Sequence, residues 1–172
     1  CFVGRLEESK GLPALLDAFG NLDKIDWIEK LHCVGEKSGR EINGKINLPD
    51  NIPVIFHGIL DRQRINKIYE KSHFIILPSR SEGFPKVLAE ASSFGCIPIV
   101  PPIASILSQI NKKKKNGIVL EDITSQGIRK TIENLQKIRD QLSKYSLNAI
   151  QDVETYSYEK YNQRILNEII QN

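Results

Sequence analysis

A polar segment between an apolar run and a helical pattern carries the residues best suited to chemistry. It has the sequence Ser79-Arg80-Ser81-Glu82-Gly83-Phe84-Pro85-Lys86-Val87-Leu88-Ala89-Glu90. Because proline is favoured in the first turn of a helix, we expect a helix to open near Pro85. The free N–H groups and partial positive charge of a helix start form a seat for phosphate. Gly83 allows the backbone to come close to a ligand there.

Two carboxylates frame this segment, Glu82 before the expected helix and Glu90 inside it. A carboxylate accepts two hydroxyl donors at once, which suits the vicinal diol of a sugar ring or a ribose. The segment can therefore hold a sugar at Glu82, phosphates at the helix start and a ribose at Glu90. The pattern alone equally allows Glu82 to be a charge near a helix N-terminus and Glu90 a surface residue.

A second group of charged residues lies in the segment Gly4-Arg5-Leu6-Glu7-Glu8-Ser9-Lys10-Gly11. It places Arg5 and Lys10 in a loop after a short apolar run. Arginine offers a fork of donors that fits phosphate oxygens, and lysine adds a point charge. The alternative is a solvated loop in which Glu7 and Glu8 balance the two cations.

Short apolar runs alternate with amphipathic stretches along the chain. We predict strands at 2–4, 31–34, 54–57, 74–77, 97–100 and 117–120. We predict helices at 12–19, around 65–69, at 85–94, and from 125 almost to the end with a break near 156–157. Strands apolar on both faces that alternate with helices indicate an α/β fold, a Rossmann-like doubly wound parallel sheet with helices on both faces.

In such sheets, ligands bind beyond the carboxyl ends of the strands. The segments that follow the predicted strands are therefore the expected walls of a site. They are 5–10, 35–39, 58–61 and 79–85. Both groups of charged residues fall within or directly beside these segments.

Composition and charge narrow the class of protein. The chain has 172 residues, 40% of them hydrophobic and 26% charged, which is ordinary for one globular domain. The net charge of +3 suits an anionic small molecule. We expect no nucleic-acid partner, because aromatic residues do not alternate with basic ones. The run Lys112–Lys115 is either a solvated loop or a patch that binds anionic lipid or phosphate. No apolar run approaches the ~20 residues of a membrane span.

Cysteine, histidine and glycine patterns exclude several classes of site. The cysteines are odd in number and far apart, which supports neither a zinc site nor a disulfide framework, and we expect a reducing compartment. Histidines that lie in or beside strands are expected to pack at the core or at strand edges. The cysteines are Cys1, Cys33 and Cys96, and the histidines are His32, His57 and His73. Trp27 and the phenylalanines are expected in the core. No Walker loop and no dinucleotide glycine fingerprint occurs, which counts against ATPases and dehydrogenases.

Together these segments resemble the C-terminal domain of family 4 (group 1) retaining glycosyltransferases, whose GT-B fold has two Rossmann-like domains. The similarity runs over most of the chain. It rests on Val3-Gly4-Arg5-Leu6 with Lys10-Gly11, Val34-Gly35, Ile55 to Leu60, Leu77 to Ala91 with Gly95 and Pro98, and Tyr156-Ser157-Tyr158. The stretch from Glu82 to Glu90 resembles the family's E-x7-E motif, which is its most specific feature.

The resemblance implies a role for each matching position. Arg5 and Lys10 would bind the donor diphosphate and steady the leaving group, Glu82 would bind hydroxyls of the transferred sugar, and Glu90 would bind the ribose. Backbone groups would complete the donor site at Gly4, Gly35, Gly58, Leu60, Gly83, Phe84, Pro85, Lys86 and Val87. The implied donor is a nucleoside diphosphate sugar such as a UDP- or GDP-sugar, and neither cofactor nor metal is expected, because the arginine and the lysine replace the cation.

The resemblance also implies how the chain fits into a larger enzyme. Because the chain begins at Cys1 and contains no methionine, we expect it to be part of a longer protein with a missing upstream domain. That domain would bind a glycan or lipid-linked acceptor, and the helix at 157–172 would pack toward it. Residues 1–172 form a single expected domain, inactive alone, in a hexosyltransferase of polysaccharide or glycolipid synthesis. We expect a cytoplasmic location, with peripheral contact to a membrane as an option.

Two departures from the family pattern and two rival interpretations stay open. The stretch 101–105 replaces a Gly-Gly-x-Pro-Glu-like segment, which puts a ligand contact from that loop in doubt, and Phe94 replaces a small residue. One rival is a binding or regulatory module that kept the fold without catalysis, and intact Arg5, Lys10, Glu82 and Glu90 argue against it. The other is an unrelated flavodoxin-like domain, which the missing glycine pattern and the paired glutamates disfavour.

Overall fold

The computed structural model describes residues 1–22, 26–36, 52–83, 85–110 and 113–154. Its strands are β1 Phe2–Val3, β2 Leu31–Val34, β3 Val54–Phe56, β4 Phe74–Ile76, β5 Ile97–Val100 and β6 Ile118–Val119. Every pair of neighbouring strands is parallel. Each strand lies where the sequence predicts one, and several are a residue or two shorter than expected.

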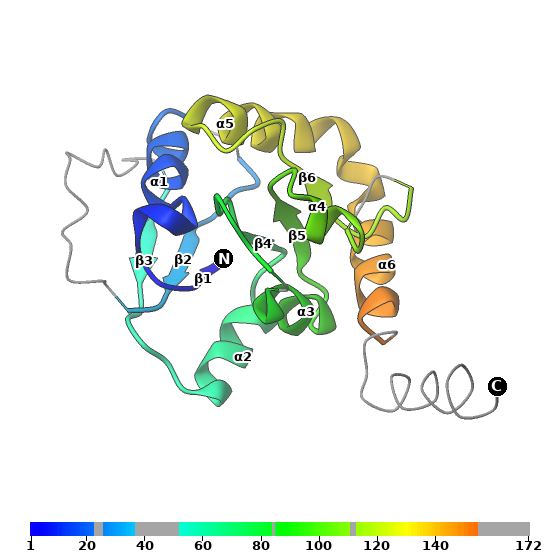
Figure 1. Ribbon diagram of the computed structural model, residues 1–172, viewed down its shortest axis with the longest axis horizontal. Helices are drawn as coiled ribbons and strands as arrows, with labels where there is room; N and C mark the ends of the chain where they lie inside the picture. The colour runs from blue at the N-terminus through cyan, green and yellow to red at the C-terminus, as the bar shows by residue number, and fades with distance from the viewer. Residues whose placement is uncertain (23–25, 37–51, 84, 111–112, 155–172) are drawn as a thin grey trace.

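The strands form two three-stranded groups that meet at Cys1. One group has the order β1-β2-β3 and the other β4-β5-β6. The backbone nitrogen of Cys1 donates to the Phe74 carbonyl over 2.6 Å, and Ile76 N donates to the Cys1 carbonyl over 2.9 Å. The strands therefore follow one another as β3-β2-β1-β4-β5-β6 (Figure 1). This is the strand order of a doubly wound sheet, and it confirms the predicted fold class.

Helices cover both faces of the strands, as parallel connections require. The α-helices are α1 Leu12–Gly20, α2 Arg62–Glu70, α3 Lys86–Ser93, α4 Ala104–Leu107, α5 Ser125–Asn134 and α6 Leu142–Glu154. Two 3₁₀ segments are η1 Glu8–Lys10 and η2 Leu135–Gln141. Helix α1 packs against α5, and α3 packs against α6. Figure 1 shows α1 and α5 on one side of the strands and α2 and α3 on the other.

One apolar core joins the two halves of the domain. It includes Phe2 of β1, three leucines of α1, and isoleucines of β4 and β5. Its fully enclosed side chains include Phe2, Leu12, Leu15, Leu16, Ile75 and Ile128. Because residues from both three-stranded groups share this cluster, it fixes the carboxyl ends of β1 and β4 relative to each other.

Some elements differ from the sequence prediction. Strand β3 pairs with β2 alone among the described strands, so Phe56 is 37% exposed, and Phe94 at the end of α3 is equally exposed. The expectation that these two phenylalanines belong to the core is therefore wrong. The helix from Ser125 is interrupted by η2, and η1 and α4 were not expected. The break at 156–157 and the helix at 157–172 lie outside the described residues.

Candidate functional site

The carboxyl ends of the first three strands are joined through their glycines. Gly4 N donates to the Val34 carbonyl over 3.0 Å, and Gly35 N donates to the Gly58 carbonyl over 2.9 Å. Three of the predicted donor-site glycines therefore lie at one edge of the sheet. A β-carbon at Gly35 would lie 1.8 Å from the carbonyl oxygen of Gly4, so only glycine fits this close approach.

The loops after β1 and β4 also pack backbone to backbone. Gly11 has a φ of 73°, and a β-carbon there would lie 2.1 Å from the Pro78 carbonyl oxygen. Arg80 N donates to the Ser9 carbonyl over 3.1 Å. These contacts bring the two groups of charged residues singled out in the sequence side by side.

Lys10 and Glu82 form the central ion pair of this edge. Lys10 Nζ lies 2.7 Å from Glu82 Oε1, and the two side chains are only 23% and 11% exposed. Lys10 is the last residue of η1, which ends at Gly11 with its left-handed backbone. The local turn after β1 therefore directs this lysine toward the loop after β4, 72 residues further along the chain.

Arg5 takes a more exposed place in the same loop. Its Nη2 lies 3.3 Å from Glu7 Oε1, and its side chain is 67% exposed. Glu7 also accepts a hydrogen bond from the Ser9 hydroxyl. The guanidinium group is thus exposed, and it is held by one ion pair to a glutamate that is only 17% exposed.

Glu90 is paired with an arginine that the sequence analysis did not single out. Arg62 Nη1, in the first turn of α2, lies 3.0 Å from Glu90 Oε1 on α3. The start of α2 is fixed by Asp61, whose carboxylate accepts from Arg64 N over 2.9 Å. Beside this pair, burial raises the pKa of Tyr69, and the charge of Glu90 adds to the effect.

The start of α3 has the properties of an anion-binding site, and the helix begins one residue later than predicted. Pro85 precedes the helix with an extended backbone, at φ −76° and ψ 97°, so the first helical residue is Lys86. No side chain caps this helix end, which leaves its first N–H groups directed outward. Of the other residues predicted for the donor site, Gly83 and Lys86 are exposed, and Leu60 and Val87 pack partly against the core. Phe84 lies outside the described residues.

The loop after β5 also reaches this edge. Ser105 Oγ donates to the Glu82 carbonyl over 2.7 Å. Because the stretch 101–105 departs from the family pattern, its sequence put a ligand contact from this segment in doubt. Ser105 lies in the four-residue helix α4, and its sequence gives no signal of a partner 23 positions away.

Comparison with known proteins identifies the family. The sequence profile described as "Glycosyl transferases group 1" matches residues 1–152. The chain belongs to this family. The match includes β1, the two ion pairs and all of α6 except its last two residues.

Individual proteins and solved structures are also similar to this chain. An uncharacterized glycosyltransferase of Haemophilus influenzae is 32% identical over 127 residues, which are 69% of this chain and 34% of that protein. The chain thus spans about a third of that relative's length. The C-terminal domain of the group 1 family protein LpcC from Francisella tularensis superposes with a TM-score of 0.76 at 22% identity, covering 91% of this chain and 85% of that one. Anabaena HepE in complex with UDP-glucose superposes with a TM-score of 0.77 at 18% identity, covering 99% and 49%.

In this glycosyltransferase domain, the histidines and cysteines have structural surroundings. His32 Nδ1 in β2 and His57 Nε2, directly after β3, lie 2.8 Å apart. Burial, with the charge of His57 adding, lowers the pKa of His32. His73 is exposed at the start of β4. The three cysteines are free thiols. Burial raises the pKa of Cys33 to about 12 and that of Cys96 to about 11, so both stay protonated.

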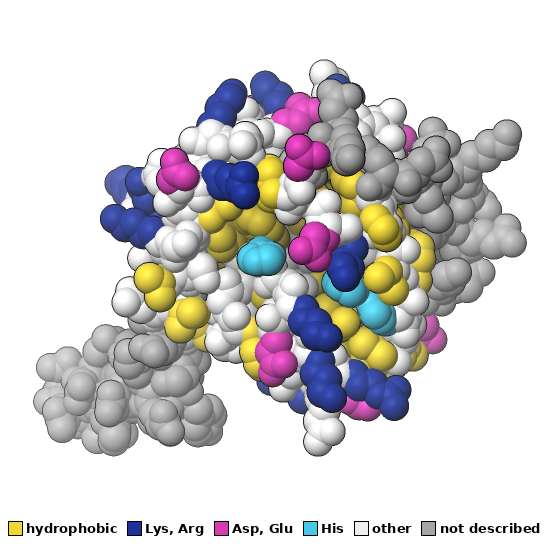
Figure 2. All heavy atoms as spheres, turned by 180° about the vertical axis from the view of Figure 1, so that it is seen from behind, with side chains coloured by type: hydrophobic (Ala, Val, Ile, Leu, Met, Phe, Trp, Pro, Cys, Tyr) yellow, Lys and Arg dark blue, Asp and Glu magenta, His cyan; other side chains and the backbone are white. Residues whose placement is uncertain are grey.

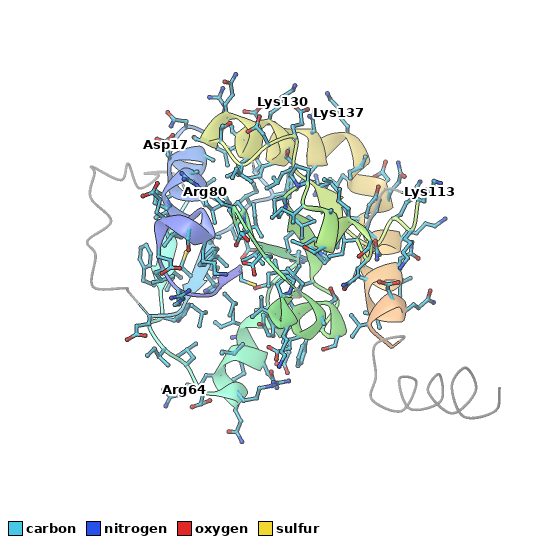
Figure 3. The ribbon with its side chains drawn as sticks, in the orientation of Figure 1. Asp17, Arg64, Arg80, Lys113, Lys130 and Lys137 are labelled. Atoms are coloured by element: carbon cyan, nitrogen blue, oxygen red, sulfur yellow. The ribbon has the colours of Figure 1, made fainter. Side chains whose placement is uncertain are left out.

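The described part of the basic run, Lys113 to Lys115, lies apart from the loops after β1 and β4, and Lys112 lies outside the described residues. Lys114 pairs with Asp152 at 2.7 Å, and Lys115 Nζ donates to Gln141. Lys113 projects on the opposite side of the molecule from Arg80 (Figure 3). On the face in Figure 2, basic side chains occur in small groups near acidic ones rather than as one positive surface.

Two further features of the described residues concern metals and membranes. No three or more histidine, cysteine or acidic side chains lie close enough together there to hold a metal ion. Within the same residues, no helix combines the length and apolar character that crossing a membrane requires.

A separate hollow lies between α3, α4 and α6. It is lined mainly by apolar side chains, and its polar members are Ser92, Gln109, Asn116 and Asp152. Asn116 Nδ2 donates to Asp152 Oδ2 over 2.9 Å and to the Gln109 carbonyl over 2.7 Å. The hollow includes none of the charged residues predicted for the site, Arg5, Lys10, Glu82 and Glu90, so the candidate site is the edge that carries the two glutamates.

Proposed function

We propose that this chain is the donor-binding half of a retaining glycosyltransferase that uses a nucleoside diphosphate sugar. The observation that carries the proposal is the placement of Glu82 and Glu90. Each carboxylate is held at the carboxyl edge of the sheet by a cation from a neighbouring segment, Lys10 at 2.7 Å and Arg62 at 3.0 Å. Two fixed carboxylates with a helix start between them match a donor with a sugar, a diphosphate and a ribose.

Each part of the donor has a partner in this arrangement. Glu82 accepts hydroxyl groups of the transferred sugar, and Glu90 accepts those of the ribose. Lys10, Arg5 and the N–H groups at the start of α3 bind the diphosphate. As the glycosidic bond breaks, negative charge grows on the leaving diphosphate, and these positive groups offset it.

The same logic removes the need for a metal ion. A lysine and an arginine near the diphosphate supply the charge that Mg²⁺ supplies in other nucleotide enzymes. We therefore propose that transfer requires no divalent cation. Turnover that is unchanged in excess EDTA would support this, and a loss that Mg²⁺ or Mn²⁺ restores would contradict it.

The chain acts within a larger protein in this proposal. Anabaena HepE, of which the chain covers 49%, has been crystallised with UDP-glucose. A second domain would bind the acceptor, a glycan or lipid-linked sugar, and complete the reaction centre. Residues 1–172 would then bind the donor without transferring a hexose, in a cytoplasmic protein that contacts a membrane at most peripherally.

The slow hydrolysis of the donor by the protein tests the proposed reaction without knowledge of the acceptor. The protein is incubated with α-linked UDP-, GDP-, ADP- and dTDP-glucose, and the first-formed glucose is followed by NMR. A retaining enzyme releases the α-anomer, and Lys10→Met abolishes the release. Release of the β-anomer contradicts retention, and binding without turnover by the complete protein supports the non-catalytic module.

A further inference from the structure

Ser105, in the short helix α4 that follows β5, contacts Glu82, the residue proposed to bind the donor sugar. Ser105 Oγ donates to the carbonyl oxygen of Glu82 over 2.7 Å, across 23 positions of sequence. Lys10 holds the carboxylate of the same residue over 2.7 Å. Glu82 is thus tied at its backbone from one side and at its side chain from the other.

The hydroxyl of Ser105 is itself held in a fixed position. The next residue, Ile106, is 2% exposed and belongs to the core, and Ile106 N donates to the Ile103 carbonyl over 2.9 Å. Ser105 O accepts a hydrogen bond from Ser108 Oγ over 3.0 Å. The short helix α4 therefore presents Ser105 to the Glu82 loop from an anchored base, although the serine is exposed.

Glu82 needs such support because it stands in an irregular loop between β4 and α3. The neighbouring Gly83 borders open space, since a β-carbon added there would have no atom within 4 Å apart from those of Gly83 and its two chain neighbours. A carboxylate selects a sugar only if its position is fixed to a fraction of an ångström. Fixing the backbone at Glu82 fixes where its carboxylate meets the sugar.

From this we infer that Ser105 is a positioning residue for recognition of the transferred sugar, acting through Glu82. The inference rests on the proposed function, since it assigns the sugar to Glu82. Its consequence is specific: loss of the Ser105 hydroxyl weakens the contribution of the sugar to binding and leaves that of the nucleoside diphosphate unchanged.

Calorimetric titration of the complete protein separates these two contributions. UDP-, GDP-, ADP- and dTDP-glucose are each compared with the matching nucleoside diphosphate, and the ratio of the two dissociation constants is the readout. Ser105→Ala should weaken binding of the nucleotide sugar about three- to tenfold, the range for one neutral hydrogen bond, with less than about twofold change for the nucleoside diphosphate. Ser105→Thr, which keeps the hydroxyl, should restore the wild-type ratio.

Two further variants keep the outcomes distinct. Ser146→Ala removes a comparable bond, from Ser146 Oγ to the Gly95 carbonyl over 2.7 Å, that involves neither Ser105 nor Glu82, and its ratio should equal that of the wild type. Glu82→Ala tests the proposed function itself and should abolish the contribution of the sugar. If Glu82→Ala does so and Ser105→Ala leaves the ratio unchanged, or lowers affinity for both ligands equally, the role of Ser105 is overturned and the donor site stands. If the wild-type protein shows no contribution from the sugar, both are overturned.

Discussion

At the scale of single residues, the ion pair between Glu90 and Arg62 bears on the proposed ribose site. The pair is partly exposed, with Glu90 30% and Arg62 70% accessible, so its own contribution to stability is at most about 1 kcal/mol. Arg62 contacts Oε1, and a carboxylate has about four acceptor positions in all. Ribose hydroxyls can therefore bind Glu90 while the arginine keeps its contact.

Replacement of Glu90 by alanine should weaken donor binding by at least tenfold, about 1.4 kcal/mol. The ribose hydroxyls lose their acceptor, and Arg62 loses its partner on α3. Titration calorimetry with the preferred nucleotide sugar measures the change. Glu70→Ala, at the exposed end of α2, is the matched control and should change nothing. An unchanged dissociation constant in Glu90→Ala would remove the ribose assignment.

Arg5 offers a second test at this scale, because it is proposed to bind the diphosphate. Arg5→Ala should weaken binding of a nucleoside diphosphate sugar by roughly tenfold, since charged hydrogen bonds contribute about 1.5–3 kcal/mol. Binding of the free nucleoside, which has no phosphate, should not change. The control is Arg64→Ala, an equally exposed arginine on α2. Equal losses for both ligands in Arg5→Ala would reject the phosphate role.

At the scale of elements, the turn between η1 and α1 depends on a glycine for two reasons. Gly11 has a left-handed backbone with a φ of 73°, and a β-carbon there would lie 2.1 Å from the Pro78 carbonyl oxygen. Gly58 also has a left-handed backbone, with a φ of 66°, but nothing lies within 4 Å of its added β-carbon. The two glycines therefore separate backbone strain from a steric clash.

Gly11→Ala should lower the free energy of unfolding by more than about 3 kcal/mol, because strain and clash add. Gly58→Ala should lower it by about 1 kcal/mol, from backbone strain alone. Urea denaturation followed by circular dichroism gives both values. Similar losses in the two variants would mean that the close packing of the loops after β1 and β4 is not needed for stability.

The strands and most helices could be predicted from sequence because their apolar patterns are strong. Leu31–Val34 and Ile97–Val100 are uninterrupted apolar runs or nearly so, and both form strands with the predicted bounds. The short helix α4 could not be predicted, because four residues show no periodicity. Phe56 was assigned to the core because sequence does not reveal that β3 has only one neighbour among the described strands.

At the scale of the whole molecule, the order of the strands in the sheet brings the residues of the candidate site together. Only after β1 and β4 become neighbours do Lys10 and Glu82 lie together, and the rule that ligands bind beyond the carboxyl ends of strands anticipated this edge. The partners Arg62 and Ser105 could not be predicted, since their contacts cross 28 and 23 positions of sequence. A local pattern holds no information about such pairs.

Stability of the whole domain should fall in mild acid because of the histidine pair. Burial, with His57 adding, lowers the pKa of His32 below its ordinary value of 6.5. Just below pH 6.5 the unfolded chain binds a proton at His32 that the folded chain does not, so the free energy of unfolding decreases as the pH falls. Urea denaturation between about pH 7.5 and about pH 5 should show this decrease.

Substitution of His32 tests whether this residue causes the dependence of stability on pH. His32→Gln removes the titrating group and should flatten the dependence of stability on pH over this range. The same change at His73, which is exposed at the start of β4, should leave the dependence as in the wild type. If the slope survives in His32→Gln, the histidine pair is not its source.

The central claim, a nucleotide-sugar site between Glu82 and Glu90, is tested most directly by calorimetric titration of the protein. UDP-, GDP-, ADP- and dTDP-sugars are titrated into the wild type and into the double variant Glu82→Ala/Glu90→Ala. The account predicts that one nucleotide class binds with one site per chain and that the double variant loses this binding. Undiminished binding in the double variant, or no binding of any class by the complete protein, would contradict it.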